Sequence, residues 1–204
     1  MRIIWLQVYR KRGHDEKAVK LLTEEELGEF SFFRRPTMRE FLTLGARTVV
    51  ERTALGSRTS VRMQDDMPFV CHCRVRADSL AACVITDTEY HEMAAHNLLN
   101  LILKDFDTAV GPRRWQNTQQ DGAVTVPEIA EKMRQYQDPE EADKLLRIQR
   151  NIDEVMEIMH RNMEEILRRG ETLDSLASKA DDISAASYGF YRTAKRNNQC
   201  CKAY

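Results

Sequence analysis

The chain has 204 residues, of which 42% are hydrophobic and 31% charged, and its 31 basic residues nearly balance its 32 acidic residues. The formal net charge of −1 argues against a chain built to neutralise nucleic-acid phosphates. With eight glycines and five prolines, the chain is neither collagen-like nor a proline-rich linker. A transmembrane helix is also excluded, because no apolar run approaches roughly 18 residues.

The first two-thirds of the chain carry the patterns of a mixed α and β fold. Strands are expected over residues 2–9, 17–22, 69–75 and 80–86, and helices over residues 37–53, 93–106 and 126–136. Two of the helices begin at a proline, Pro36 or Pro127, which the first helical turn tolerates. Residues 113–122 are polar and are expected to form a loop. The elements predict an α+β domain with a three- to five-stranded antiparallel sheet flanked by helices.

Three cysteines lie within the predicted strands. On a strand, Cys71 and Cys73 share one face and His72 points to the other. Zinc sites use about four ligands, often in paired spacings, and this triplet has no second pair. We therefore expect Cys71, Cys73 and Cys83 to be buried thiols and predict no metal site. The N-terminus lacks the apolar core of a signal peptide, which favours a reducing compartment over a disulfide framework.

The C-terminal third shows helical periodicity without strand signals. Fifteen positions over 49 residues recur with a mean step of 3.5, which is the period of a left-handed coiled coil. Such a helix needs helical partners to cover its seam. The positions are Leu145, Ile148, Ile152, Val155, Met159, Asn162, Ile166, Arg169, Leu173, Leu176, Ala180, Ile183, Ser187, Phe190 and Ala194.

Two polar residues, Asn162 and Arg169, interrupt this seam. A buried arginine without acceptors would cost several kcal/mol. Arg169 therefore either extends its aliphatic side chain so that the guanidinium reaches solvent, or it donates hydrogen bonds to acceptors on partner helices. Gly170 follows directly and lowers helix propensity by about 1 kcal/mol relative to alanine. We expect this segment to be marginally helical alone and to order on binding its partners.

The end of the chain carries two adjacent cysteines. Cys201-Lys202-Ala203-Tyr204 has the spacing of a prenylation box, and Cys200 could carry a second lipid. The alternative, that these are chance cysteines near a terminus, stays open on this feature alone. Basic residues of the tail, Arg192, Lys195, Arg196 and Lys202, favour an approach to anionic lipid or are simply solvated.

Residues 151–176 resemble the R-SNARE motif of the synaptobrevin superfamily. The stretch 167–176, Leu-Arg-Arg-Gly-Glu-Thr-Leu-Asp-Ser-Leu, is similar to prenylated longin R-SNAREs of the YKT-six type. The segments Phe32-Phe33-Arg34-Arg35, Val84 to Tyr90, Asn97 to Asn100, Tyr136 to Pro139 and Tyr188 to Cys201 extend the resemblance over nearly the whole chain.

The resemblance implies three units: a longin domain over residues 1–137, a SNARE motif over residues 138–198 and a lipidated tail over residues 199–204. The longin domain is expected to have a profilin-like, five-stranded antiparallel sheet, followed by one long coiled-coil helix. Arg169 becomes the ionic-layer residue, which meets glutamines from three Q-SNARE helices in a parallel bundle. Cys201 is the implied prenylation site, and Cys200 takes palmitate or a second lipid. The domain is expected to fold back on the SNARE segment through a groove that includes Leu42, Leu44, Ala46 and Val50, with Leu44 at the family's aromatic position.

The implied function is a fusion protein of intracellular transport, with a cytoplasmic pool and a pool on the cytosolic face of Golgi, endosomal and vesicle membranes. Covalent lipids are the only expected cofactors, and neither nucleic acid nor a small-molecule substrate is expected. The absence of a G-x-x-x-x-G-K-[ST] motif excludes a small GTPase, and the five histidines have no catalytic spacing with a serine or cysteine. The alternative is a longin-type adaptor whose coiled coil oligomerises without driving fusion.

Overall fold

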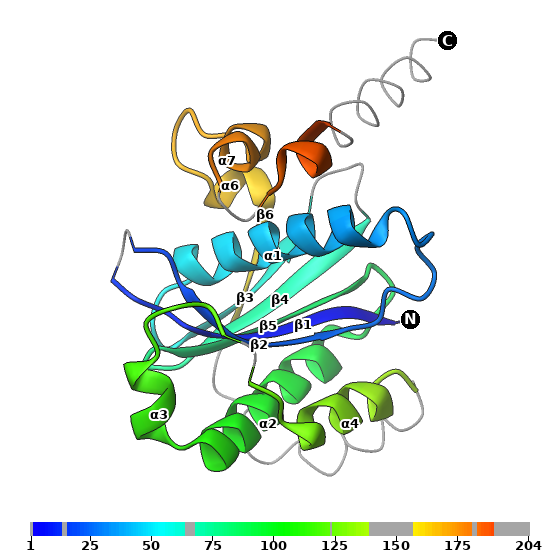
Figure 1. Ribbon diagram of the computed structural model, residues 1–204. Coiled ribbons are helices and arrows are strands. Elements are labelled where there is room, and N and C mark those ends of the chain that lie inside the picture. The colour runs from blue at the N-terminus through cyan, green and yellow to red at the C-terminus, as the bar shows by residue number, and fades with distance from the viewer. Residues whose placement is uncertain are drawn as a thin grey trace.

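A computed structural model describes residues 2–13, 16–63, 68–122, 124–138, 157–180 and 183–189 (Figure 1). The predicted seam positions Leu145, Ile148, Ile152, Val155, Phe190 and Ala194 lie outside these ranges, as do Cys200 and Cys201. Within them the chain forms one sheet between two layers of helices, and the end of the described chain lies on the layer that contains α1.

The sheet has six strands in the order β2-β1-β5-β4-β3-β6. Their bounds are Ile3–Arg10 for β1, Val19–Glu25 for β2, Ser57–Arg62 for β3, Phe69–Val75 for β4, Leu80–Asp87 for β5 and Ile158–Asn162 for β6. The first five pair antiparallel, whereas β6 runs parallel to β3. The prediction of a strictly antiparallel five-stranded sheet is therefore wrong in one detail: a C-terminal segment adds a parallel edge strand.

Alternation along the strands explains why both faces of the sheet are covered. In β4 and β5, Cys71, Cys73 and Cys83 point to one face with no exposed surface, while Val84 points to the other. This confirms the prediction of buried strand cysteines. Burial raises the pKa of the Cys73 and Cys83 thiols well above their usual range, so both stay protonated at neutral pH.

Four helices complete the N-terminal domain. Helix α1 (Arg35–Arg52) covers the cysteine face, and α2 (Glu92–Val110) and α4 (Pro127–Gln135) cover the opposite face. Helix α3 (Pro112–Asn117) occupies part of the stretch that we expected to be loop. It forms because Gly111, with φ +81°, ends α2, and Pro112 is suited to a first helical turn. Trp115 anchors the turn, since its indole donates to Asp107 at 2.8 Å.

The C-terminal segment differs most from its prediction. In place of one long helix, residues 157–180 form β6, α6 (Met163–Ile166) and α7 (Leu173–Lys179), and residues 185–189 form a further helical turn. Extended backbone at Leu167 and Ala180 ends the two short helices. Capping boxes begin them, with Asn162 and Glu165 at α6 and Thr172 and Ser175 at α7. The breaks let the segment pair with β3 at the sheet edge and then cross α1, which one straight helix could not do.

Candidate functional site

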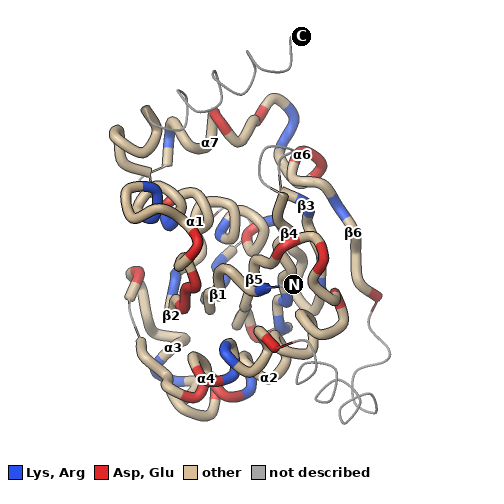
Figure 2. Tube along the Cα trace, turned by 90° about the vertical axis from the view of Figure 1, so that its right-hand side faces the viewer, with Lys and Arg blue, Asp and Glu red and all other residues tan. Residues whose placement is uncertain are grey.

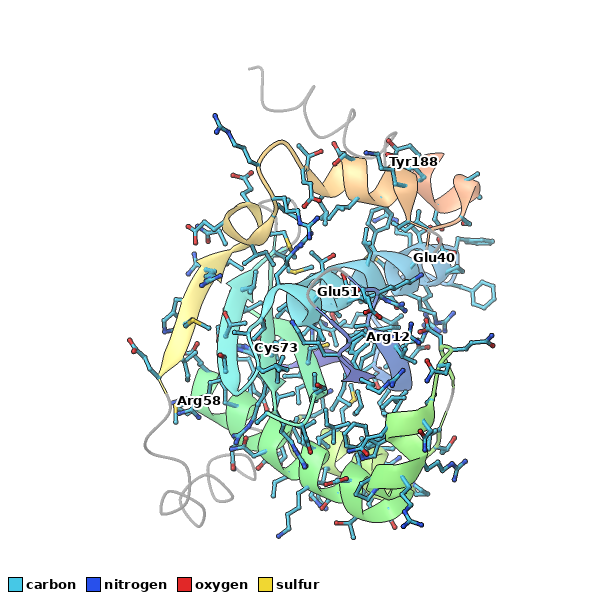
Figure 3. All side chains as sticks on the ribbon, turned by 90° about the vertical axis from the view of Figure 1, so that its left-hand side faces the viewer. Arg12, Glu40, Glu51, Arg58, Cys73 and Tyr188 are labelled. Atoms are coloured by element: carbon cyan, nitrogen blue, oxygen red, sulfur yellow. The ribbon has the colours of Figure 1, made fainter. Side chains whose placement is uncertain are left out.

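The outer face of α1 is covered by the C-terminal segment, and we call residues 157–180 and 183–189 the docked segment. Figure 2 shows α7 crossing above α1 and β6 along the sheet edge outside β3. In Figure 3, Glu40 of α1 lies beneath the last docked turn, which carries Tyr188. The site is thus a contact between two distant parts of one chain.

Apolar side chains form the centre of this contact. Five residues of the docked segment are buried in the same cluster as the side chains of α1, each with an exposed fraction of 9% or less: Met163, Ile166, Leu173, Ala177 and Ile183. Leu176, Ala180 and Tyr188 pack against this cluster with partial exposure. Removing so much apolar surface from water is the main favourable term for docking.

Polar contacts fix the docked segment at both ends of α1. Glu40 Oε2 accepts hydrogen bonds from the backbone N–H of Ser184 at 2.8 Å and from its hydroxyl at 3.1 Å. At the other end of the helix, Arg52 donates to Glu171 Oε2 at 3.2 Å. On the sheet edge, Thr59 donates its hydroxyl to the carbonyl oxygen of Met159 at 2.8 Å. These bonds set the register of the segment along the helix.

The four predicted groove residues occupy two faces of α1. At about 100° per residue, Leu44 lies within about 80° of Glu40 and Arg52, the residues that contact the docked segment. The other three, Leu42, Ala46 and Val50, lie more than about 120° from Leu44 and have no exposed surface. Leu44 is therefore placed for docking, whereas its three neighbours are placed against the sheet. Their shared role as a groove stays a prediction.

Gly45 of α1 leaves room for the side chain of Met63, which follows β3. A Cβ atom at this position would lie 3.9 Å from Cε of Met163 and 2.5 Å from Cε of Met63. Any larger residue would force Met63 to move, and Met63 itself is only 6% exposed. The helix thus presents a small residue to Met63, and Met163 of the docked segment lies at an ordinary contact distance from it.

The described seam positions are divided between the interior and solvent. Ile166, Leu173, Ile183 and Ser187 are buried, whereas Asn162 and Arg169 are exposed, and Met159, Leu176 and Ala180 are intermediate. Arg169 lies in a turn closed by a 2.8 Å bond from the Glu171 N–H to the Arg168 carbonyl. Gly170 follows with φ +85°, the left-handed region that such a turn favours at its third residue.

Sequence reasoning missed Met163 and Ala177, which are 1% and 3% exposed. Both lie off the coiled-coil seam, so a search for one helical stripe passes over them. The capping signal Asn162-x-x-Glu165, which predicts a helix start inside the expected long helix, could have indicated the break.

Among the helices of the described residues, none is both long and apolar enough to cross a membrane.

Comparisons with known proteins match both halves of the chain. A family model described as "Regulated-SNARE-like domain", the longin model, matches residues 27–132, and the Synaptobrevin model matches residues 144–204. The chain is 35% identical over 202 residues to "Synaptobrevin homolog YKT6" of Saccharomyces cerevisiae, with 98% of each chain covered. It is 39% identical over 190 residues to "Synaptobrevin homolog ykt6" of Schizosaccharomyces pombe, with 92% of this chain and 93% of the relative covered.

Proposed function

The chain belongs to the synaptobrevin family of longin-domain R-SNAREs, a non-enzymatic family of vesicle trafficking, and from that premise we propose how it works. Its SNARE motif assembles with three Q-SNARE helices into a parallel four-helix bundle, and the free energy of that assembly drives membrane fusion. The longin domain competes with the partner helices for the same segment.

The observation that carries this proposal is the burial of Ile166, Leu173 and Ile183 against the α1 layer. These residues are also predicted seam residues of the coiled coil. One side chain cannot fill both cores, so docking and bundle assembly exclude each other. The docked state then inhibits assembly by the free energy required to release the segment.

Arg169 is suited to change environment between the two states. It is exposed in the docked segment, where solvent satisfies its guanidinium. In the bundle it would enter the seam, and side-chain amide oxygens of the partner glutamines would accept its hydrogen bonds. Because arginine stays charged and offers five donors, it favours a layer that supplies several acceptors. A wrong register would bury this charge without partners.

Attachment to membranes through lipid on Cys201 and Cys200 is part of the proposal. One lipid gives marginal, reversible binding and two give stable anchoring. A singly lipidated pool would stay in the cytoplasm with its segment docked, and a doubly lipidated pool would act on the cytosolic face of Golgi, endosomal and vesicle membranes. Mass spectrometry of the C-terminal peptide from native protein tests this directly.

The competition is tested by Leu44→Glu, measured as the rate of complex formation with three Q-SNARE helices. A carboxylate at this buried position disfavours docking, so assembly should accelerate at least tenfold over wild type. Leu55→Glu is the matched control, because Leu55 is 52% exposed and should leave the rate unchanged. Equal rates for wild type and Leu44→Glu would overturn the inhibitory role of docking.

The bundle itself is tested by Arg169→Gln in lipid-anchored fusion with partners that keep their glutamines. Fusion should slow, while Arg168→Gln, one residue off the seam, should fuse like wild type. A longin-type adaptor is the alternative function. Sedimentation would reveal it as a homodimer of the C-terminal segment in place of a complex with one copy of each of the four helices.

A further inference from the structure

A cluster of histidines lies between the sheet and α2, on the face opposite α1. His72 of β4 pairs in register with Ser60 of β3, and both point towards α2. Glu92 and His96 are one turn apart on that helix and share its inward face. His72 and His96 are 3% and 1% exposed, so their ring nitrogens depend on protein partners.

The hydrogen bonds determine which ring nitrogens carry protons. Thr86 donates its hydroxyl to the Asp87 carbonyl at 3.0 Å, so it must accept from Nε2–H of His72 at 3.2 Å. His72 Nδ1 is then unprotonated and accepts from the Ser60 hydroxyl at 2.9 Å. Because the Ser60 hydroxyl proton is donated to His72, the Ser60 oxygen must accept from Nε2–H of His96, at 3.0 Å.

This chain of bonds leaves an unprotonated lone pair on His96 Nδ1. Among the residues that the structure describes, that buried atom has no hydrogen-bond partner. Burial lowers the pKa of His96 to about 2 and that of His72 to about 4, so both rings are neutral at physiological pH. His96 thus presents a free Nδ1 lone pair while the Ser60 hydroxyl holds its Nε2–H. Histidines that bind metals are oriented in this way. On His72, Thr86 holds Nε2–H and the Ser60 hydroxyl occupies Nδ1, so a metal ion would have to displace that hydroxyl.

From this arrangement we propose that His72, His96 and Glu92 form a zinc site, with His160 of β6 as the fourth ligand. One ligand atom from each of the first three residues lies within 4.8 Å of the others. Ligands of tetrahedral zinc are about 3.3 Å apart, so closure requires shifts of about 1 Å in the side chains. His160 Nδ1 already lies 3.4 Å from Glu92 Oε1.

The site has an open approach and a preference among metals. A cavity of about 440 Å³ connects the cluster to solvent, and His72, Glu92 and His160 are among the residues that line it. Arg62 and Arg161 line the same cavity, and the positive charges of Arg58 and Arg74 act on His96. These arginines repel any divalent cation, so the preference comes from the ligands. Mg²⁺ and Ca²⁺ bind through several oxygen ligands and this set offers one carboxylate, whereas imidazole nitrogens suit Zn²⁺.

Because His160 belongs to the docked segment, bound zinc would tie β6 to the longin domain. Zinc would therefore oppose release of the segment, a consequence that rests on the proposed function. The metal site itself does not, since it is formed by one chain and can be measured without partner helices.

The test titrates zinc into the full-length, unlipidated chain by calorimetry, with Mg²⁺ and Ca²⁺ in parallel. Cys200→Ser and Cys201→Ser are present in every sample, because terminal thiols also bind zinc. We expect one zinc per chain and no binding of the other two ions. Glu92→Gln and His96→Gln should each weaken zinc binding more than tenfold. His91→Gln, at the N-cap of α2, is the control and should bind like the parent.

Absence of zinc binding, or unchanged binding in both Glu92→Gln and His96→Gln, would overturn the site. Thermal unfolding without metal shows whether His96→Gln is folded, and Glu92→Gln alters only a partly exposed residue. Hydrogen exchange tests whether zinc ties β6 to the longin domain. Zinc should slow exchange in the docked segment at least tenfold in the parent and not in His160→Gln. Equal protection in both would overturn His160 as a ligand. Neither result bears on assembly with Q-SNARE helices.

Discussion

The sheet domain and the docked segment use their apolar residues differently. In the domain, strands such as β1 and β5 have neighbours within the same unit, and each face is covered by helices of that unit. The docked segment instead carries a seam with a period suited to other helices, and its own domain covers part of that seam. Under the proposed function, the sequence specifies one structure for the domain and two for the segment, and substitutions can separate the effects on each.

The largest expected contrast is between Leu42→Ala and Leu173→Ala. The two leucines are 0% and 2% exposed, but Leu42 faces the sheet and Leu173 belongs to the docked segment. Leu42→Ala should lower the free energy of unfolding of the domain by about 2–5 kcal/mol in urea. Leu173→Ala should act mainly on docking, and it should therefore speed hydrogen exchange only in the docked segment. Faster exchange throughout the domain in Leu173→Ala would show that the two regions unfold as one.

A smaller contrast comes from two glycines with positive φ. Gly170 has φ +85° in the docked segment and Gly111 has φ +81° in the domain, with no described atom within 4 Å of an added Cβ at either. Gly170→Ala strains the docked turn by about 1 kcal/mol and favours the assembled helix by about 1 kcal/mol.

Together these effects should shift the population towards the released segment about thirtyfold. Gly111→Ala should lower domain stability and leave docking unchanged. The measurement is the rate of assembly with Q-SNARE helices, and similar rates for the two variants would contradict a role of Gly170 in the switch.

An acid titration should reveal a charged pair within the domain. Burial alone would raise the pKa of Asp121, but bonds from Arg47 at 2.5 Å and from the Lys20 N–H at 2.9 Å lower it. A lowered pKa in the folded state contributes stability above the unfolded value of about 3.9, and this is lost as pH falls through the folded value.

Asp121→Asn should therefore cost about 1–2 kcal/mol at pH 7, discounted because the Asp121 side chain is 35% exposed. The cost should shrink between pH 7 and pH 2, as the wild-type carboxyl takes up protons. Urea unfolding at the two pH values checks this, and an equal loss at both would exclude the charged pair as its cause.

The smallest expected effect concerns the ion pair between Arg52 and Glu171, whose side chains are 19% and 26% exposed. A double-mutant cycle with Arg52→Gln and Glu171→Gln should give a coupling of about 0.5 kcal/mol for docking, which weakens with salt. Hydrogen exchange of the docked segment at low and high salt provides the measurement. A coupling energy that does not change with salt would show that Arg52 and Glu171 interact through side-chain packing and not through their charges.

Sequence alone predicted most of the domain because its signals are local. The β-branched run from Ile3 and the alternation around Cys71 were sufficient for β1 and β4. Strand β3 escaped prediction because the stretch Ser57–Arg62 is mostly polar, and its register with β4 is set by pairing. The burial of Met163 and the contact between His72 and His96 depend on residues that are distant in sequence. Hydrophobic periodicity carries no information about such contacts.

The parallel pairing of β6 with β3 has a consequence for the released state. While β6 is in place, it pairs with Arg58 to Arg62 of β3 along the sheet edge. In the proposed function, each departure of the segment to its partners would uncover that edge, and an uncovered edge strand is a template for pairing with other chains. On that proposal, the molecule would become prone to self-association at the moment it becomes competent for assembly, and a short released state would limit self-association.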